Sequence, residues 1–512
     1  MDDWTAGYVA DIGYTYGYYP ELNPLRVQLA FLNAGLAFPQ SGTACELGFG
    51  QGMSTNIHAA ASVTQWSGTD FNPSHAAFAQ ELATVAGAGA RLFDESFAEF
   101  CVRDDLPDFD TIGLHGIWSW ISDANRKVIA DFIRRKLKVG GVLYISYNTQ
   151  PGWAAMVPMR HLLTEHVEAL GAPGQGIVKR IDAAIDFVDS LLATNPAYAK
   201  AQPAVVERMK GIKAQNRNYL AHEYFNRDWQ PMTFAEMNQW LAEAKLSYAC
   251  SANYLDHLDV LNLTAEQQAF LQAIPDAVFR ETVRDFMVNQ QFRRDYWVRG
   301  ARRINAIEQT ECLRRQRIVL TRPRAEVVLK ATGLLGEAMF ANEVYEPVLD
   351  VLADHAPKSL GQIEQAVAGL GISFSQVLQS AVVLAGKGDV VSAFEFEPSP
   401  AVVAQCARLN LHVMDKARSS NDVSYLASPV TGGGVTVGRF HQLFMLGKAK
   451  GGRTPNDWAS FAWSTLAGQG LKLVKDGKEL ASGTENLAEL NTQAAEFADK
   501  WLPIMTALGI CK

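Results

Sequence analysis

At 512 residues the chain exceeds the size of an ordinary domain, and its length predicts about three or four domains. Hydrophobic residues (48%) and charged residues (20%) occur in proportions typical of a globular protein that buries several cores. The formal net charge of -8 at pH 7 argues against a general nucleic-acid-binding protein, so nucleic acid is not an expected partner.

Six cysteines are spread singly along the sequence and form no CxxC pair, which argues against a disulfide framework and a zinc site. We therefore expect reduced thiols and no bound metal. The first twenty residues lack the basic and apolar regions of a signal peptide, and no apolar run reaches the roughly 18 residues that span a bilayer. These features predict a soluble, cytoplasmic protein without membrane insertion.

The predicted elements begin with five short strands that alternate with helices over residues 1–155. The expected strands are residues 43–47, 65–70, 90–93, 110–114 and 141–147, and the expected helices are residues 53–61, 76–85 and 125–137. Such alternation, with glycine at the turns, predicts an α/β fold with a doubly wound, Rossmann-like parallel sheet. Sheets of this kind bind ligands at the carboxyl ends of their strands.

Beyond this sheet the pattern is mainly helical. We expect a helical insertion over residues 156–225, and a helix and strand over residues 226–262 that complete the sheet. Residues 263–340, rich in arginine, are predicted to form a helical middle domain, and residues 341–400 have the outline of a winged helix. The last segment is predicted to be mainly α-helical over residues 401–512, with a hairpin at 471–478 and loops at 419–421 and 431–434.

A glycine-rich loop, Glu46-Leu47-Gly48-Phe49-Gly50-Gln51-Gly52, follows the first predicted strand. Gly48 permits a tight turn, Gly50 lets a ligand approach the backbone, and Gly52 allows close packing where the next helix starts. The third glycine comes one position too early for a dinucleotide fingerprint, and no Lys-Ser/Thr pair marks a P-loop. Phe49 in the loop and Asn56 in the following helix are further candidates for cofactor binding.

Two acidic residues make the loop more specific. Glu46, two residues before the first glycine, can interact with the cationic amino end of a ligand. Asp70, 24 residues later at the end of the second strand, is placed to accept hydrogen bonds from ribose hydroxyls. Because Glu46 would repel a phosphate, the pair favours an adenosine that carries an amino acid.

Five residues after the second and third strands lie where the base of such a ligand would be bound: Phe71, Asn72, Glu95, Ser96 and Phe97. Together with the loop, they resemble the class I S-adenosylmethionine-dependent methyltransferases, whose first motif is E/DxGxGxG followed by an acidic residue after the second strand. The resemblance implies S-adenosylmethionine as cofactor, with the glycines at its methionine part, Asp70 on the ribose, and Glu95 with Ser96 beside the adenine. Asp94 also fits the acidic position of the third motif; we prefer Glu95 because Ser96 then takes the small position.

The acceptor side is predicted to begin after the fourth strand, at His115-Gly116-Ile117-Trp118-Ser119-Trp120. Trp118 fits equally well an aromatic wall that guides an amine and a core residue, whereas Trp120 is expected in the core. The tyrosines from Tyr14 to Tyr19, with Tyr18 as a catalytic candidate, form either a lid or one face of an extended segment. His222-Glu223-Tyr224 is a second candidate cluster, with helix capping and packing as its alternative; it is not HExxH, so zinc is not expected.

Over most of its length the chain resembles bacterial methyltransferases with a regulatory domain, and among them the rickettsial protein-lysine methyltransferases that modify outer-membrane protein. The resemblance is carried by residues 18–20 with Pro24, 46–52, 115–120, 147–153 and 219–224. It implies that the methyl acceptor is a lysine side chain of a protein. Since a lysine ammonium (pKa about 10.4) must first lose a proton, we expect His222 and Glu223 as proton acceptors, with Trp118 and residues 14–19 as channel walls.

Two other functions also fit the sequence. A methyltransferase for a small molecule or glycan would need a base for a hydroxyl, for which His115 or His222 is the candidate. A non-catalytic binding protein would use the winged helix and the arginines around residues 293–303, for which a solvated helical face paired with acids is the alternative. The non-catalytic half is expected to shape an acceptor surface or a homodimer interface, with residues 160–220 as the candidate segment.

Overall fold

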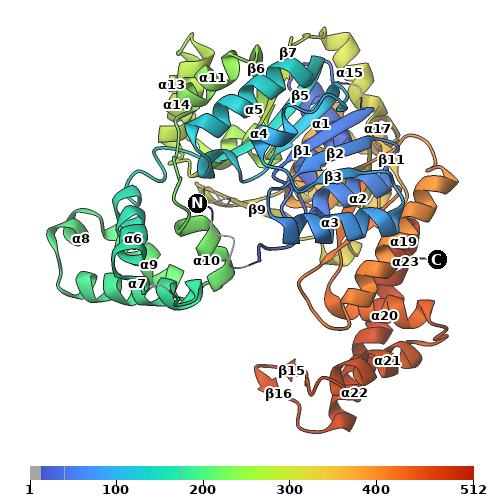
Figure 1. Cartoon of the computed structure of the whole chain (residues 1–512). Helices are drawn as coiled ribbons and strands as arrows, with labels where there is room; N and C mark the ends of the chain where they lie inside the picture. The colour runs from blue at the N-terminus through green and yellow to red at the C-terminus, as the bar shows by residue number, and fades with distance from the viewer. Residues whose placement is uncertain (1–7, 9–12, 40, 173, 512) are drawn as a thin grey trace.

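The computed structural model describes residues 8, 13–39, 41–172 and 174–511 (Figure 1). Its centre is a seven-stranded sheet with the order β3-β2-β1-β4-β5-β7-β6. The strands are β1 (Thr43–Leu47), β2 (Gln65–Thr69), β3 (Arg91–Phe93), β4 (Phe109–Leu114), β5 (Leu137–Asn148), β6 (Leu246–Ser251) and β7 (Phe292–Arg299).

Strands β1 to β5 pair in parallel, and β7 runs antiparallel between β5 and β6. Strands β1 and β4 are buried almost throughout, as expected of a parallel sheet that is covered on both faces. The predicted Rossmann-like parallel sheet is therefore confirmed. Because the parallel strands run in the same direction, the loops after β1, β2, β3 and β4 meet along one edge.

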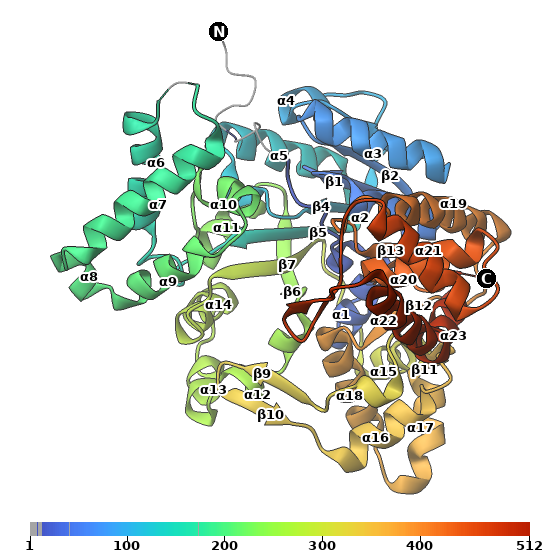
Figure 2. The same ribbon diagram turned by 90° about the horizontal axis from the view of Figure 1, so that it is seen from below.

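Helices cover both faces of the sheet (Figure 2). The helices α5 (Asp123–Lys136) and α11 (Phe234–Ala242) share one core with strand residues such as Leu47 and Ile112. Helix α1 (Pro24–Asn33) packs in a second core with Tyr144 and Tyr296 from the other face of the sheet. Helix α2 (Met53–Ala61) follows the glycine loop and α3 (Pro73–Ala86) follows β2.

Strand β7 is the main departure from the predicted elements. The prediction of helix over residues 264–340 is correct for α13 (Ala265–Gln272), α14 (Ala277–Met287) and α15 (Ala306–Arg315), but wrong at β7. Three shorter strands in this segment were also missed: β8 (Arg317–Leu320), β9 (Lys330–Gly333) and β10 (Gly336–Met339). In β7, consecutive charged residues hide the apolar alternation of a strand, although five of its eight residues are buried and the other three are partly buried.

The arginine-rich stretch is therefore not the solvated helical face that we considered. Arg293 is almost fully buried in β7 and forms ion pairs with Asp285 (2.6 Å), Glu281 (2.8 Å) and Asp295 (2.9 Å). Its guanidinium carbon also lies 4.4 Å from the ring centre of Phe234. This cluster holds helix α14, which carries Glu281 and Asp285, against the central sheet. Arg302 and Arg303, beyond the strand, are exposed.

The helical insertion lies beside the sheet as a bundle with its own core (Figures 1 and 2). It consists of α6 (Val157–Leu170), α7 (Ile177–Ala193), α8 (Ala197–Ala201), α9 (Pro203–Lys213) and α10 (Arg217–Tyr224). Apolar residues at helical spacing, among them Ile181, Ile185 and Val188 of α7, point into this core. The break in helix predicted at residues 171–174 separates α6 from α7.

The predicted outline of a winged helix is present in α16 (Asn342–Val351), α17 (Leu360–Val367), α18 (Phe374–Lys387) and the sheet β11-β8-β12. The outer strands are β11 (Lys358–Ser359) and β12 (Val390–Ala393). In helix-turn-helix proteins the second helix enters the DNA major groove. Here α18 buries Val377, Ala381 and Leu384, and the carbonyl of Ala385 accepts a hydrogen bond from Arg26. The helix is thus used for packing within the chain.

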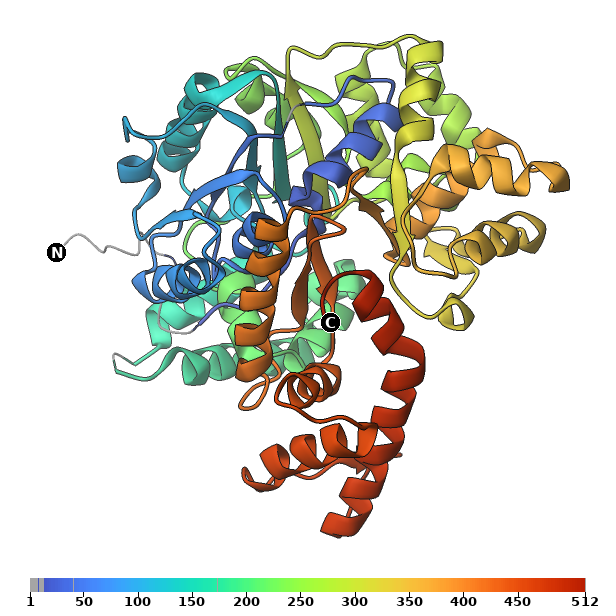
Figure 3. The same cartoon turned by 90° about the vertical axis from the view of Figure 1, so that its right-hand side faces the viewer.

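The C-terminal segment packs against the sheet domain through α19 (Pro400–Lys416), which lies along α2 and α3 (Figure 1). Leu409 of α19 shares a core with Ile57 of α2 and Leu82 of α3. The remaining elements are β13 (Tyr425–Ser428), β14 (Gly433–Thr436), α20 (Arg439–Ala449), α21 (Pro455–Ala467), β15 (Val474–Lys475), β16 (Lys478–Glu479), α22 (Gly483–Glu496) and α23 (Leu502–Ala507). Strands β13 and β14 pack on α2, whereas α21 and α22 extend from the body in Figure 3.

The hairpin predicted at residues 471–478 is confirmed by the pairing of β15 with β16. The loop predicted at residues 431–434 is wrong in its second half, because Gly433 and Gly434 begin strand β14 and pair with β13. Among the described residues, none of the helices combines the length and the apolar character that crossing a bilayer requires.

We predict that Arg293→Met strongly destabilises the protein, because it leaves the buried carboxylates of Asp285 and Asp295 without their cation. Removing one partner of a buried ion pair typically costs about 3–5 kcal/mol. Urea unfolding followed by circular dichroism measures this change. Arg302→Met is the matched control, because the Arg302 side chain is 69% exposed and should contribute at most about 0.5 kcal/mol. Equal stability of the two variants would contradict the structural role of Arg293.

Candidate functional site

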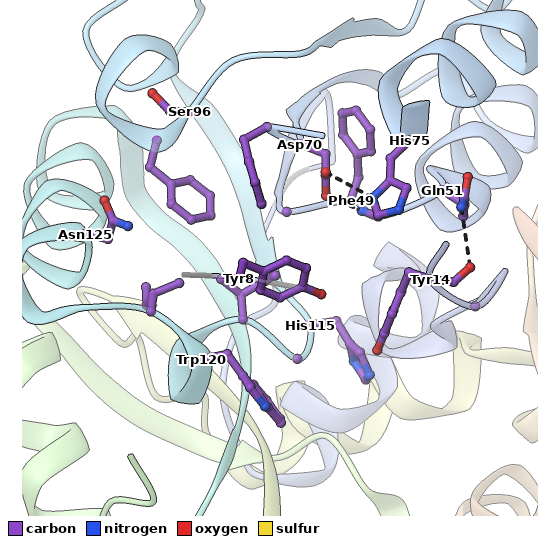
Figure 4. Close-up of a pocket in the computed structure, with 18 of the residues that line it drawn as sticks. Tyr8, Tyr14, Phe49, Gln51, Asp70, His75, Ser96, His115, Trp120 and Asn125 are labelled. Atoms are coloured by element: carbon purple, nitrogen blue, oxygen red, sulfur yellow. Dashed lines mark hydrogen bonds and ion pairs between the residues drawn. The ribbon is translucent and has the colours of Figure 1, made fainter. Parts of the chain in front are cut away.

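A cavity of about 1200 Å³, counting space open to solvent, lies at the edge where the parallel strands end (Figure 4). Its walls come from the N-terminal segment, the glycine loop, the ends of β2, β3 and β4, and the start of α5. The lining includes Tyr8, Tyr14, Tyr19, Gly48, Phe49, Gly50, Gln51, Asp70, Phe71, His75, Glu95, Ser96, Phe97, His115, Ile117, Trp120, Asn125 and Asp228. This is the position at which a doubly wound sheet binds its ligand.

The glycine loop forms the floor of the cavity. Gly48 and Gly50 have φ angles of 73° and 57°, in the left-handed region, and both line the cavity. A Cβ atom on Gly52 would lie 2.4 Å from the Cβ of Ala79, so its glycine permits α2 to pack on α3. Asn56 is buried outside the cavity, where its amide donates to the carbonyls of Gly52 (2.9 Å) and Ala79 (3.0 Å). Gly52 and Asn56 therefore support the loop from behind.

Glu46 lies fully buried at the end of β1 and is not part of the cavity wall. Its Oε2 accepts a hydrogen bond from Thr55, while its buried Oε1 has no partner among the described residues. Burial raises the pKa of this carboxyl to about 8. A cationic group next to Oε1 would satisfy the unpaired oxygen and lower that pKa.

Asp70 connects the glycine loop to the end of β2. Its Oδ2 accepts a hydrogen bond from the backbone N–H of Gly50 (2.9 Å), and its Oδ1 accepts one from the backbone N–H of Asn72 (3.0 Å). His75 of α3 lies 3.2 Å from the same Oδ1 through its Nδ1, as drawn in Figure 4. Asp70 lines the cavity, whereas Asn72 caps α3 behind it.

The residues predicted beside the adenine lie at the end of the cavity near β3. Phe71, Glu95, Ser96 and Phe97 all line it. Ser96 also caps the short helix α4 (Phe97–Phe100) in a reciprocal capping box with Glu99. Glu95 is paired with Arg103 through Oε1, and its buried Oε2 has no partner in the part of the chain that the structure describes. Glu95 therefore keeps one carboxylate oxygen for a further hydrogen-bond donor.

The tyrosines of the N-terminal segment point in two directions. Tyr14 and Tyr19 line the cavity, whereas Tyr16 packs on Phe78, and Tyr18 packs on His58 and Tyr425. Tyr18, a predicted catalytic residue, therefore faces the C-terminal domain and not the cavity. Tyr14 and Tyr19 therefore lie on the cavity side, where a lid would place them, and the tyrosines do not alternate regularly as one face of an extended segment would require. The sequence could not reveal this because the opposite surface comes from residues about 400 positions away.

His115 lies at the centre of the cavity wall. Its ring stacks on that of Tyr19 at a centroid distance of 3.5 Å, and its Nδ1 is 2.7 Å from the Tyr144 hydroxyl. Burial lowers the pKa of His115 to about 4, so the imidazole is neutral at pH 7. A neutral imidazole has one N–H and one acceptor nitrogen, so His115 can position or deprotonate a group in the cavity.

The structure decides between the two interpretations of Trp118, the first tryptophan after β4. Trp118 is fully buried, packs edge-to-face on Trp240 at 5.8 Å, and does not line the cavity. The prediction of Trp118 as a channel wall is therefore wrong. Trp120 is buried (7% exposed), as expected of a core residue, and it also lines the cavity. The two residues share a short 3-10 turn, Trp118–Trp120, and its orientation could not be read from their spacing.

The predicted pair His222 and Glu223 lies on α10 next to the cavity but not in its wall. The His222 ring is 5.0 Å from that of Tyr14 and 5.3 Å from that of Tyr8. Partial burial raises the pKa of Glu223 to about 7, and its charge in turn raises the pKa of Tyr14 after the larger effect of burial. Both candidates are therefore within reach of the aromatic lid.

Several lining residues were missed by sequence reasoning: Tyr8, Gln51, His75, Asn125 and Asp228. Gln51 and His75 could have been found, because they lie in the glycine loop and at the start of the helix after Asp70. Asp228 could not, because it follows the helical insertion and returns to the cavity only in the folded chain.

Comparison with known proteins supports the same fold. The family described as “Predicted methyltransferase regulatory domain” matches residues 216–299. An uncharacterized protein of Synechocystis sp., sll1526, is 39% identical over 512 residues, which is 99% of each chain. An uncharacterized protein of Rickettsia prowazekii, RP789, is 29% identical over 197 residues, covering 38% of this chain and 34% of that one.

Among solved structures, PKMT2 from Rickettsia typhi in complex with AdoHcy has a TM-score of 0.70 at 18% identity. The similarity covers 97% of this chain and 100% of PKMT2, so the two share one fold over nearly their whole length. A second PKMT2 structure gives a TM-score of 0.69. The sheet, the insertion and the C-terminal domains thus belong to one architecture.

We predict that Gly52→Ala destabilises the protein more than Gly89→Ala does. Both glycines have left-handed φ angles, 68° and 74°, so each substitution carries about 1–2 kcal/mol of backbone strain. Only the Gly52 variant adds a clash with Ala79, since no atom lies within 4 Å of the Gly89 position. Overpacking costs about a further 1–3 kcal/mol. Thermal unfolding of the two variants measures the difference, and equal destabilisation would show that α2 and α3 are not closely packed here.

Proposed function

The chain belongs to one family with the uncharacterized Synechocystis protein and matches the methyltransferase regulatory domain over residues 216–299. From this premise we propose that it transfers methyl groups from S-adenosylmethionine to lysine side chains of a protein. The observation that carries the proposal is the glycine loop with its two acids. Gly50 presents its backbone to the cavity and is held by Asp70, while Glu46 lies behind the loop with an unsatisfied oxygen.

The residues present fit S-adenosylmethionine. Its sulfonium makes the attached methyl group electrophilic, which is the chemistry that the cofactor supplies. Asp70 would hold the ribose hydroxyls through the free acceptor capacity of its carboxylate, and Glu46 would take the ammonium of the methionine part. Glu95, with its free Oε2, would accept from the adenine amino group. PKMT2, which shares the fold, was solved with AdoHcy, the product of such a cofactor after methyl transfer.

The open part of the cavity supports a cationic acceptor. Tyr8, Tyr14, Tyr19 and Trp120 contribute aromatic rings, which attract cations and pack against alkyl chains. Asp228 adds a carboxylate to the same wall. A lysine side chain has both the alkyl chain and the positive charge that these residues suit. The name PKMT2 and the resemblance to the rickettsial protein-lysine methyltransferases point to the same acceptor.

Glu223 is our candidate for the proton acceptor of the reaction. A lysine nitrogen can attack the methyl group only after it loses a proton, and desolvation between aromatic rings lowers its pKa. Glu223, whose pKa is raised to about 7 by burial, is poised to take a proton at neutral pH. His222 would hold the lid tyrosines in place through its ring contacts.

A hydroxyl acceptor is the alternative, and His115 is the observation that favours it. This imidazole is neutral, lines the cavity and is oriented by Tyr144, as a general base for a hydroxyl would be. In that case the enzyme would methylate a small molecule or glycan.

We also propose that the protein works in the cytoplasm and forms a homodimer. All six cysteines are unpaired in the structure, as is usual in a reducing compartment.

The helical insertion exposes Leu170 (67%) and Phe187 (42%), and it is our candidate for the dimer interface.

We expect the full-length protein to bind AdoHcy in isothermal titration calorimetry, and Asp70→Ala to weaken binding by roughly ten- to a hundredfold. Hydrogen bonds to a charged group contribute about 1.5–3 kcal/mol, which corresponds to that range. Asp108→Ala is the control, because Asp108 is exposed and far from the cavity wall. With methyl-labelled S-adenosylmethionine, label should enter lysines of a protein extract. Label found only in small molecules would contradict the lysine acceptor, and no AdoHcy binding would contradict the proposed function.

We expect Glu223→Gln to remove the rise of activity with pH near 7. Below its pKa of about 7 the Glu223 carboxyl is protonated and cannot accept a proton, so wild-type activity should increase as pH rises through 7. The Gln variant should lose at least about tenfold in kcat at pH 7.5 while keeping its AdoHcy affinity. Glu168→Gln, at an exposed position of α6, is the control. An unchanged pH profile in the Glu223 variant would assign the proton transfer to water or to another group.

A further inference from the structure

The N-terminal segment Gly13–Tyr19, which we call the roof, lies between the cofactor loop and the C-terminal domain. On its inner side Tyr14 covers the glycine loop: a Cβ on Gly50 would be 3.4 Å from the Tyr14 ring, and the Gln51 amide donates to the Tyr14 carbonyl at 3.4 Å. Tyr19 donates its backbone N–H to the Ser54 hydroxyl of α2 at 2.6 Å and stacks on His115. The roof thus contacts the loop at Gly50 and Gln51 and the start of α2 at Ser54.

On its outer side the roof is held by residues Thr431–Gly434, which we call the clasp. The Tyr18 hydroxyl forms a hydrogen bond with the Gly434 backbone, and its ring lies 5.4 Å from that of Tyr425. A Cβ on Gly433 would lie 2.4 Å from the Tyr18 hydroxyl, and one on Gly434 would lie 3.0 Å from the Tyr18 ring. Glycine is required at these positions by the close approach of Tyr18.

Two polar side chains strengthen the same contact. Asn23, just after the roof, donates from Nδ2 to the carbonyl of Thr431 at 3.0 Å. The buried ring of His58 lies between the two segments, 3.4 Å from the carbonyl of Gly432 and 3.3 Å from that of Tyr19. A neutral imidazole has one N–H and therefore bonds one of these carbonyls at a time.

We infer that the clasp is a positioning element of the cofactor site: the C-terminal domain holds the roof against the glycine loop and so sets the affinity for the cofactor. The inference rests on the proposed function for the identity of the ligand. Its physical basis is that Tyr14 and Tyr19 belong to one short segment with Tyr18. When Tyr18 is fixed, its neighbours have few conformations left to lose on binding, and preorganised contacts give tighter binding.

The test is Gly433→Ala in the full-length protein, with AdoHcy affinity measured by calorimetry. The added methyl group collides with the Tyr18 hydroxyl (2.4 Å) and with Nδ2 of Asn23 (2.7 Å), displaces the roof and should weaken AdoHcy binding by at least tenfold. Gly438→Ala is the matched control, because Gly438 follows the same hairpin and no atom lies within 4 Å of its Cβ position. The double variant Tyr18→Phe/Gly433→Ala removes the nearer of the two colliding atoms and leaves only the contact with Asn23, so it should recover part of the affinity. Additive losses in the double variant would overturn the inference.

Hydrogen exchange of residues 13–19 separates this inference from the proposed function. If the clasp holds the roof, Gly433→Ala should raise the exchange rate of these amides at least tenfold without ligand, while α5 keeps its wild-type protection. If the wild type does not bind AdoHcy, the proposed function fails, and the exchange result still decides on the clasp. Wild-type exchange together with wild-type affinity in Gly433→Ala would overturn it. Should that variant not fold, Tyr18→Phe, which adds no volume, should still show faster exchange.

Discussion

The hydrogen bond from the Gly50 amide to the Asp70 carboxylate is the contact on which the site depends. It joins the loop after β1 to the end of β2, and so fixes the floor of the cavity relative to the wall that follows β2. Parallel pairing of β1 with β2 brings these two loops together, and the second carboxylate oxygen of Asp70 fixes the start of α3 through Asn72. A change in the register of these strands would separate the carboxylate from the loop and remove its bond to Gly50, whereas the bond to Asn72, two residues further along the same segment, would stay.

The parts of the site that the sequence predicted are those whose geometry is local. The glycine loop lies within seven residues: Gly48 makes the expected tight turn with a φ of 73°, Gly50 lines the cavity, and Gly52 permits helix packing. Asp70 was found for the same reason, since the end of a strand next to the loop must lie at the same edge of the sheet.

The parts that failed depend on distant residues. The positions of Trp118 and Trp120 in the sequence do not reveal which of them faces the cavity. In the folded chain Trp118 packs on Trp240 from α11 and is fully buried. Tyr18 turns away from the cavity because the hairpin β13–β14 offers it a surface. Strand β7 was predicted as helix because Arg293 and Asp295 are charged, yet they are buried as partners in one ion-pair cluster. Local patterns record the polarity of a residue, and these three cases were decided by its neighbours in space.

The place of β7 in the sheet has a consequence for the order in which the protein can assemble. This strand joins β5 to β6, but it is encoded after both of them, beyond the insertion and α14. During synthesis from the N-terminus, β6 has no strand to pair with until residues 292–299 have emerged. The roof acquires its outer contacts still later, because the clasp consists of residues 431–434. The glycine loop is thus among the earliest parts of the chain to be made, while the clasp that holds the roof over it is among the last.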